Sequence, residues 1–126
     1  MGKRPVNATP EPCPAKASLR ERSLIADEQA TELEALFEVM ANDTRLKLLH
    51  EIARRDEVCV IDLAAAVGMK PRAVSNQLRR LLDKGIVAAR QNGNNVFYRI
   101  VDNCVLILLD RGLCLIEETA RRAGKS

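Results

Sequence analysis

The sequence predicts one mostly α-helical domain that carries a single β-hairpin. Apolar residues recur at spacings of three and four over most of the chain, which is the period of an amphipathic helix. The exception is a pair of alternating segments on either side of an Asn-Gly turn, the pattern of a β-hairpin. The 126 residues, 47% of them hydrophobic, suffice for one core, and no apolar stretch approaches the roughly 20 residues of a membrane span.

The first 17 residues are predicted to form a flexible tail, because they contain four of the five prolines and little apolar surface. We expect the folded domain to span residues 18–123. It begins with one broken helix or two short helices, whose apolar residues run from Leu19 to Met40. Asn42 can cap the next helix. The apolar stripe of that helix is predicted to consist of Leu46, Leu49, Ile52 and Ala53.

Two short helices joined by a tight turn are predicted next. After the β-prone residues 58–60, a helix over residues 62–68 ends at a glycine. The second helix begins at Pro71, which suits a first-turn position, and ends at Gly85. It buries Val74 and Leu78 and leaves arginine and amide side chains on its other faces. This arrangement, with a basic second helix, is a helix-turn-helix.

The hairpin and one long helix complete the domain. Residues 86–91 and 96–100 are predicted strands around a turn at 92–95, and a hairpin in this place is the wing of a winged helix-turn-helix. The last helix is predicted over residues 102–123, and its apolar surface is too wide for one side of a small monomer. We therefore expect a homodimer that forms through the N- and C-terminal helices.

The net charge of +3 conceals an uneven distribution. Residues 18–41 carry two arginines against six acidic residues, whereas residues 69–99 carry seven basic residues against one aspartate. A basic segment of this kind favours a nucleic-acid partner, and the alternative is an ordinary solvated face. The N-terminus has basic residues but not the apolar core of a signal peptide, so we expect a cytoplasmic protein.

Five short motifs follow one another in an order that resembles the ArsR/SmtB family of bacterial metal-sensing repressors. The resemblance covers roughly residues 30–120, and the motifs occupy residues 41–49, 57–63, 75–81, 84–87 and 96–99. It implies a transcriptional repressor of heavy-metal resistance rather than an enzyme. Such a protein binds an inverted-repeat operator as a homodimer and leaves it when a metal or metalloid ion binds.

The helix-turn-helix and the wing supply the predicted contacts to double-stranded DNA. Lysine and arginine bind phosphates, whereas asparagine and glutamine can pair with the edge of adenine in the major groove. On the second helix the candidates are Lys70, Arg72, Ser75, Asn76, Gln77, Arg79 and Arg80. On the wing they are Arg90, Asn92, Asn94 and Asn95. For Arg79 and Arg80 the alternative is a surface ion pair with Asp83.

The candidate effector ligands are the four cysteines, Cys13, Cys59, Cys104 and Cys114. A reducing compartment argues against a disulfide framework, and thiolates select soft ions. The resemblance implies that Cys59 matches the first cysteine of the metal box in arsenic-, cadmium- and lead-responsive relatives, whereas Ile61 replaces the second cysteine. It also implies that Cys13, on the tail, could complete such a site. The single histidine, His50, is expected to be structural or solvent-facing.

The last helix offers another arrangement by the same resemblance. Asp102 and Cys104 match the first ligand pair of the zinc-sensing relatives, and Glu118 matches their final carboxylate, so Asp102 and Glu118 are weaker candidates. Cys104 and Cys114 lie about 15 Å apart along one helix and could share an ion only across an antiparallel dimer. A sulfur-rich site favours Cd, Pb, Hg or As(III), with Zn as the alternative ion.

Other roles for the cysteines stay open. Each cysteine could be a small buried hydrophobe, because free cysteine is common in protein cores. The same scaffold could instead carry a repressor that senses thiol oxidation or reactive sulfur. A cysteine enzyme is disfavoured, because the chain has one histidine and no glycine-rich phosphate loop.

Overall fold

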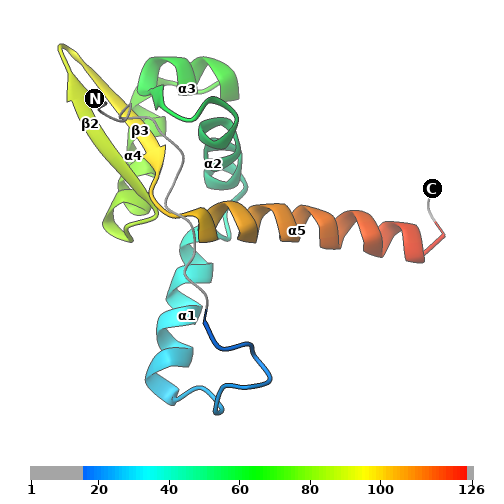
Figure 1. Cartoon of the computed structure of the whole chain (residues 1–126). Coiled ribbons are helices and arrows are strands. Elements are labelled where there is room, and N and C mark those ends of the chain that lie inside the picture. The colour runs from blue at the N-terminus through cyan, green and yellow to red at the C-terminus, as the bar shows by residue number, and fades with distance from the viewer. Residues whose placement is uncertain (1–15, 125–126) are drawn as a thin grey trace, which may run out of the picture.

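The computed structural model describes residues 16–124. In this part of the chain the elements follow one another as α1 (Asp27–Met40), α2 (Asp43–Arg55), β1 (Val58–Cys59), α3 (Val60–Val67), α4 (Pro71–Asp83), β2 (Val87–Asn92), β3 (Asn95–Ile100) and α5 (Asn103–Arg122). Helices α2, α3 and α4 gather beside the small sheet, while α1 and α5 extend away from this body in different directions (Figure 1). Almost all of the predicted tail, including Cys13, lies outside the described residues.

The first helix is shorter than predicted. Helix α1 begins at Asp27, and the expected helical residues Leu19 and Leu24 lie exposed outside it. The helix starts where the local signals are strongest: Asp27 and Glu28 occupy its first turn, and the side chain of Gln29 accepts a hydrogen bond from the Ala26 amide at 3.0 Å. Helical spacing of apolar residues alone did not extend the helix, because no part of the chain within residues 16–124 buries Leu19 and Leu24.

The start signals predicted for the next helices are confirmed. The side chain of Asn42 caps α2 by accepting a hydrogen bond from the Arg45 amide at 3.0 Å. Gly68 ends α3 in the left-handed conformation, with φ of 69°, and Pro71 occupies the first turn of α4. These local features place α3 and α4 as a helix-turn-helix.

The core is aliphatic except for Tyr98 and centres on α2. The fully buried side chains come from α2, β1, α3 and α4 and are Leu48, Leu49, Ile52, Val58, Leu63, Val74, Leu78 and Leu81. Burying one such side chain stabilises a fold by about 1.5–3 kcal/mol. The predicted stripe of α2 omitted Leu48 and included Leu46, which is 38% exposed and lines a groove on another face of the helix. Leu46 thus lies on a different face of α2 from the buried leucines.

The sheet has three antiparallel strands in the order β1-β3-β2. The hairpin is confirmed, and β1 joins its β3 side through the pairs Val58 with Tyr98 and Cys59 with Phe97. Its turn consists of Gly93 and Asn94, with a φ of 66° at the glycine. Asn94 does not have a positive φ. The residue with positive φ is therefore the first of the two central turn residues, as in a type II′ turn.

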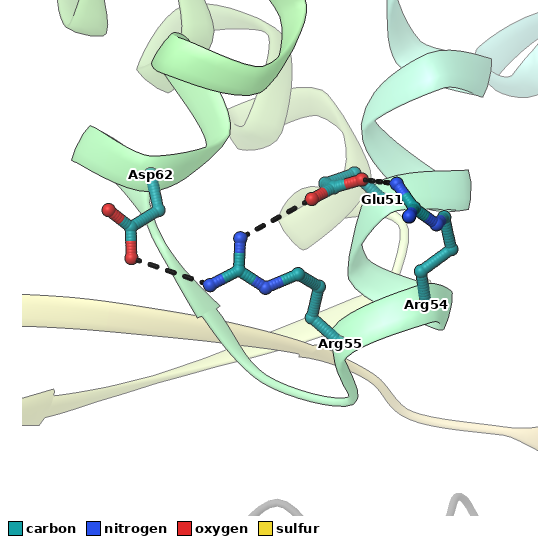
Figure 2. Close-up of polar contacts among 4 residues, drawn as sticks. All are labelled: Glu51, Arg54, Arg55 and Asp62. Carbon is teal, nitrogen blue, oxygen red and sulfur yellow. Dashed lines mark hydrogen bonds and ion pairs between the residues drawn. The ribbon is translucent and has the colours of Figure 1, made fainter.

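Surface ion pairs connect the end of α2 to α3 (Figure 2). Glu51 pairs with Arg54 at 2.8 Å and with Arg55 at 3.4 Å, and Arg55 also reaches Asp62 at 3.8 Å. Exposed pairs of this kind contribute little to stability, about 1 kcal/mol or less each. Within the described residues, no helix has the length and apolar character needed to cross a membrane.

Tyr98 provides a test of the packing between the sheet and α4. Burial raises the pKa of its phenol above the ordinary value, and the positive charge of Arg79 partly offsets this shift. The chain has one tyrosine and no tryptophan, so tyrosinate absorbance reports on this residue alone.

We expect the midpoint of the rise in tyrosinate absorbance to lie above about pH 10 in the native protein. In the urea-unfolded chain the midpoint should lie near the ordinary pKa of about 10. Because the pKa of Tyr98 is higher in the folded state, its contribution to the unfolding free energy is fully present below about pH 10. This contribution is lost as the pH rises through the native pKa. The variant Tyr98→Phe should lack this part of the decrease in unfolding free energy. A native midpoint at or below that of the unfolded chain would contradict this packing.

Candidate nucleic-acid interface

Most of the residues predicted to contact phosphates and bases are exposed on α4 or just before it. Ser75 and Asn76 are exposed, as are the cations Lys70, Arg72, Arg79 and Arg80. Across residues 16–124, none of these four cations forms an ion pair, so the alternative pairing with Asp83 is not observed. The surface therefore presents polar amide and hydroxyl groups among cations that are available to phosphates.

Gln77 differs from its neighbour Asn76, because its side chain turns toward α2. Its Oε1 accepts a hydrogen bond from a terminal guanidinium nitrogen of Arg45 at 2.8 Å. The prediction that Gln77 reads base edges stays a prediction, with its carbonyl oxygen already engaged inside the protein.

Arg45 is a central residue that sequence reasoning missed. Its side chain is buried, with 7% of the residue exposed, and its Nε donates to the backbone carbonyl of Val39 near the end of α1. Together with the bond to Gln77, this contact links α1, α2 and α4. A signal was present, because Arg45, Leu48, Leu49 and Ile52 have the spacing of one buried helix face.

The wing has exposed amide side chains at its tip, and its arginine, Arg90, is hydrogen-bonded within the protein. Asn92, Asn94 and Asn95 are exposed, as predicted for DNA contacts. The guanidinium of Arg90 instead donates to both carboxylate oxygens of Glu57, at 2.7 and 2.8 Å. This hydrogen bonding raises the pKa of Arg90 above its ordinary value. Arg90 also lies over the ring of Phe97, 5.1 Å from its centroid.

The three described cysteines lie on two different elements, β1 and α5. Cys59 on β1 and Cys114 on α5 are half-buried free thiols, and Cys104 lies exposed in the first turn of α5. Asp102 caps α5 by accepting from the Cys104 amide at 2.8 Å, and Glu118 pairs with Arg121 at 2.7 Å. Over residues 16–124, no group of three or more His, Cys, Asp or Glu side chains is arranged to hold a metal ion.

An apolar groove of about 510 Å³ runs between α1, α2 and α5. Its walls are formed by Phe37, Met40, Ala41, Leu46, Lys47, His50, Leu108, Leu109, Gly112, Leu113 and Ile116. The single histidine therefore borders an apolar groove rather than a cluster of metal ligands. Ile107 and Leu115, at other positions of α5, are also exposed.

Residues 42–89 match the family model described as bacterial regulatory protein, arsR family. The putative arsenical resistance operon repressor ArsR2 of Halobacterium salinarum is 42% identical over 84 residues, which cover 66% of this chain and 70% of that protein. This chain belongs to the ArsR/SmtB family of transcriptional repressors. The SmtB homolog of Synechocystis is also 42% identical, and the chain spans 61% of its length.

Solved structures of ArsR/SmtB relatives share the fold. The antimony-specific transcriptional repressor AntR is 60% identical, with a TM-score of 0.74 and coverage of 86% of this chain and 98% of that chain. A homodimeric winged helix-turn-helix DNA-binding domain from Mycobacterium bovis is 28% identical, with a TM-score of 0.69 and coverage of 78% and 93%. The predicted fold class is therefore confirmed.

Alanine substitution of two neighbouring amides on α4 should affect different properties, DNA affinity for Asn76 and stability for Gln77. Asn76→Ala should lower affinity for a selected DNA site about tenfold or more, because a bidentate amide–adenine pair contributes about 1–3 kcal/mol. Its unfolding free energy should change by less than about 0.5 kcal/mol. Gln77→Ala should lower the unfolding free energy by about 1–3 kcal/mol, because it leaves a donor of the buried Arg45 unpaired. Urea unfolding and fluorescence anisotropy measure the two effects, and equal stability of the variants would contradict the assigned contact.

Proposed function

We propose that this protein is a homodimeric repressor that leaves operator DNA when a thiophilic metalloid or metal ion binds its cysteines. Residues 18–123 form the DNA-binding and dimerisation domain in this proposal. The observation that carries it is the 60% identity to an antimony-specific repressor. Helix α5, which extends away from the body of the domain (Figure 1), adds two cysteines and several exposed apolar residues.

The DNA-binding part of the proposal rests on α4 and the wing tip. The exposed face of α4 and the residue before it combine Ser75 and Asn76 with four cations that form no ion pair within residues 16–124, and a helix of this kind fits the major groove. In a symmetric dimer the two α4 helices would contact half-sites one helical turn apart, roughly 34–36 Å. An inverted-repeat operator follows from that two-fold symmetry.

The dimer is supported by the apolar surface that one chain leaves uncovered. Leu113 and Ile116 line the groove beside α5 and are 50% and 66% exposed. A contiguous apolar surface of this kind marks an interaction site on a soluble domain. A second copy of the chain supplies the same apolar surface, so the two copies can cover each other.

Charged substitutions in the groove test the dimer. Leu113→Glu or Ile116→Glu should convert the protein to a monomer in light scattering and lower affinity for a two-half-site DNA at least tenfold, because one half-site contact is lost. Ile61→Glu on α3 is the matched control, since Ile61 is 59% exposed outside the groove. A groove variant that remains dimeric at the same protein concentration would contradict the proposal.

The effector site is proposed to use Cys104 and Cys114, with Cys59 as the alternative. The two α5 cysteines are about 15 Å apart along the helix, too far to share an ion within one chain. An antiparallel pairing of two α5 helices near residue 109 would bring Cys104 of one protomer opposite Cys114 of its partner. Cys59 lacks a second cysteine nearby on its own segment, because Ile61 is not a ligand. Cys13, outside the described residues, is a candidate for a third sulfur.

The favoured effector is trivalent antimony or arsenic. Thiolates are soft ligands, and the one histidine, His50, borders the apolar groove, so a nitrogen-rich site for zinc, nickel or cobalt has little support. Among the relatives, one structure is described as antimony-specific, ArsR2 as an arsenical resistance repressor and CadC of Listeria innocua as a cadmium resistance regulator. Cadmium, lead and mercury are thus the comparison ions, and zinc, an ion of borderline softness, is the control.

Titration of the reduced protein on DNA tests the effector and its ligands together. The DNA is a site selected from a random pool by the metal-free protein, and the additions are antimonyl tartrate, arsenite, cadmium chloride and zinc chloride. Antimonyl or arsenite should lower DNA affinity about 5–150-fold, the usual range of allosteric coupling. Cys104→Ser and Cys114→Ser should bind DNA normally without this response, whereas Cys59→Ser should keep it.

Each other outcome changes the proposal. Loss of the response in Cys59→Ser alone would move the site to β1. Release by peroxide or polysulfide, with no response to any metal or metalloid, would replace the metalloid sensor by a thiol-redox sensor. Sulfur-to-metal charge-transfer absorption in each variant provides a readout that does not depend on DNA.

A further inference from the structure

Cys59, Phe97 and Arg90 lie side by side across the outer face of the sheet. Phe97 on the central strand β3 pairs with Cys59 of β1 on one side and with Arg90 of β2 on the other. Directly opposed residues of antiparallel strands point to the same face. The next pair along, Val58 with Tyr98, is buried on the opposite face against the core. Arg90 therefore starts on the face of the wing that is directed away from the core.

Arg90 is nonetheless held by the body of the domain. Its Nε and a terminal nitrogen donate to the two carboxylate oxygens of Glu57, at 2.7 and 2.8 Å, in the bidentate geometry typical of strong charge-assisted pairs. The side chain of Glu57 is only 6% exposed and that of Arg90 is 33% exposed. The guanidinium also covers the ring of Phe97, a favourable cation–π arrangement.

This pair joins two strands that are not neighbours in the sheet. Glu57 directly precedes β1, whereas Arg90 belongs to β2, and the strand order places β3 between them. Strand β1 has two residues, so few backbone hydrogen bonds attach it to the hairpin. The Glu57–Arg90 contact crosses β3 with Phe97 beneath it and adds a side-chain link between the wing and the segment that enters α3.

We propose that Glu57, Arg90 and Phe97 form a clamp that positions the wing, and that Arg90 acts through this clamp and not as a phosphate contact. The inference rests on the DNA-binding role proposed above. The charge of Arg90 is neutralised by Glu57, so it adds little to the attraction for phosphates. Freeing Arg90 for DNA would leave a nearly buried carboxylate unpaired beside a polyanion, which is costly.

The two roles of Arg90 predict opposite effects of removing the acidic partner. If Arg90 bound a phosphate, Glu57→Gln would release it and raise DNA affinity, while Arg90→Gln would reduce the salt dependence by about one phosphate contact. For a clamp, Glu57→Gln and Arg90→Gln should each weaken binding about fivefold to tenfold, with little change in salt dependence. The double variant should be no weaker than either single variant, because both remove one shared interaction.

Fluorescence anisotropy at several salt concentrations, on the selected DNA site, measures these effects. Arg79→Gln is the matched comparison, because Arg79 is an exposed arginine without an ion pair in the described chain, and its loss should reduce the salt slope by about one contact. Higher affinity of Glu57→Gln, additive single effects, or unchanged affinity in both variants would overturn the clamp.

A DNA-free measurement separates the clamp from the proposed function. Amide hydrogen exchange at Val58, Cys59 and Phe97 should become faster in Glu57→Gln and in Arg90→Gln, because the β1–β3 pairing loses its side-chain link. Asn94→Ala, at the wing tip, should leave this exchange unchanged. Unchanged exchange in both clamp variants would overturn the clamp even if the protein binds DNA. Faster exchange in a protein that binds no DNA would leave the clamp intact and refute the DNA-binding role.

Discussion

Burial of one face of α2 is the constraint on which the rest of the structure depends. One face places Leu48, Leu49 and Ile52 in the core, where they support the helix-turn-helix and the sheet. Another face turns Leu46 toward the groove that α1 and α5 border. The surface proposed to contact DNA and the proposed dimer surface thus share one supporting helix.

Two polar contacts extend this arrangement from the core to the surface proposed to contact DNA. Arg45 connects the end of α1 with Gln77 in the middle of α4, and Glu57 connects the start of β1 with Arg90 in the wing. Both contacts remove a polar side chain from the exposed surface and use it to orient the element that carries it. In a buried or half-buried setting such pairs are expensive to break, so they favour a single orientation of each element.

The helix that carries the proposed effector site, α5, follows the wing directly along the chain. Strand β3 ends at Ile100 and α5 begins at Asn103, and the backbone between them is tied to Ile86 by the Val101 amide at 3.2 Å. An ion held between two α5 helices would bias the angle between protomers, and each wing continues directly into its own α5. Such a ligand changes DNA affinity only as far as it binds the DNA-free geometry better than the DNA-bound one.

The sequence by itself determined the order of the elements and most of their ends. Asn42, Gly68 and Pro71 act through hydrogen bonds and backbone angles of their immediate neighbours, so their effect can be read locally. Only the tertiary structure decided where α1 begins, that β1 becomes a third strand, and that Leu48 rather than Leu46 enters the core. It also decided the partners of Gln77 and Arg90, which lie 32 and 33 residues away along the chain. Those choices depend on which surfaces meet in three dimensions, and no local propensity encodes that meeting.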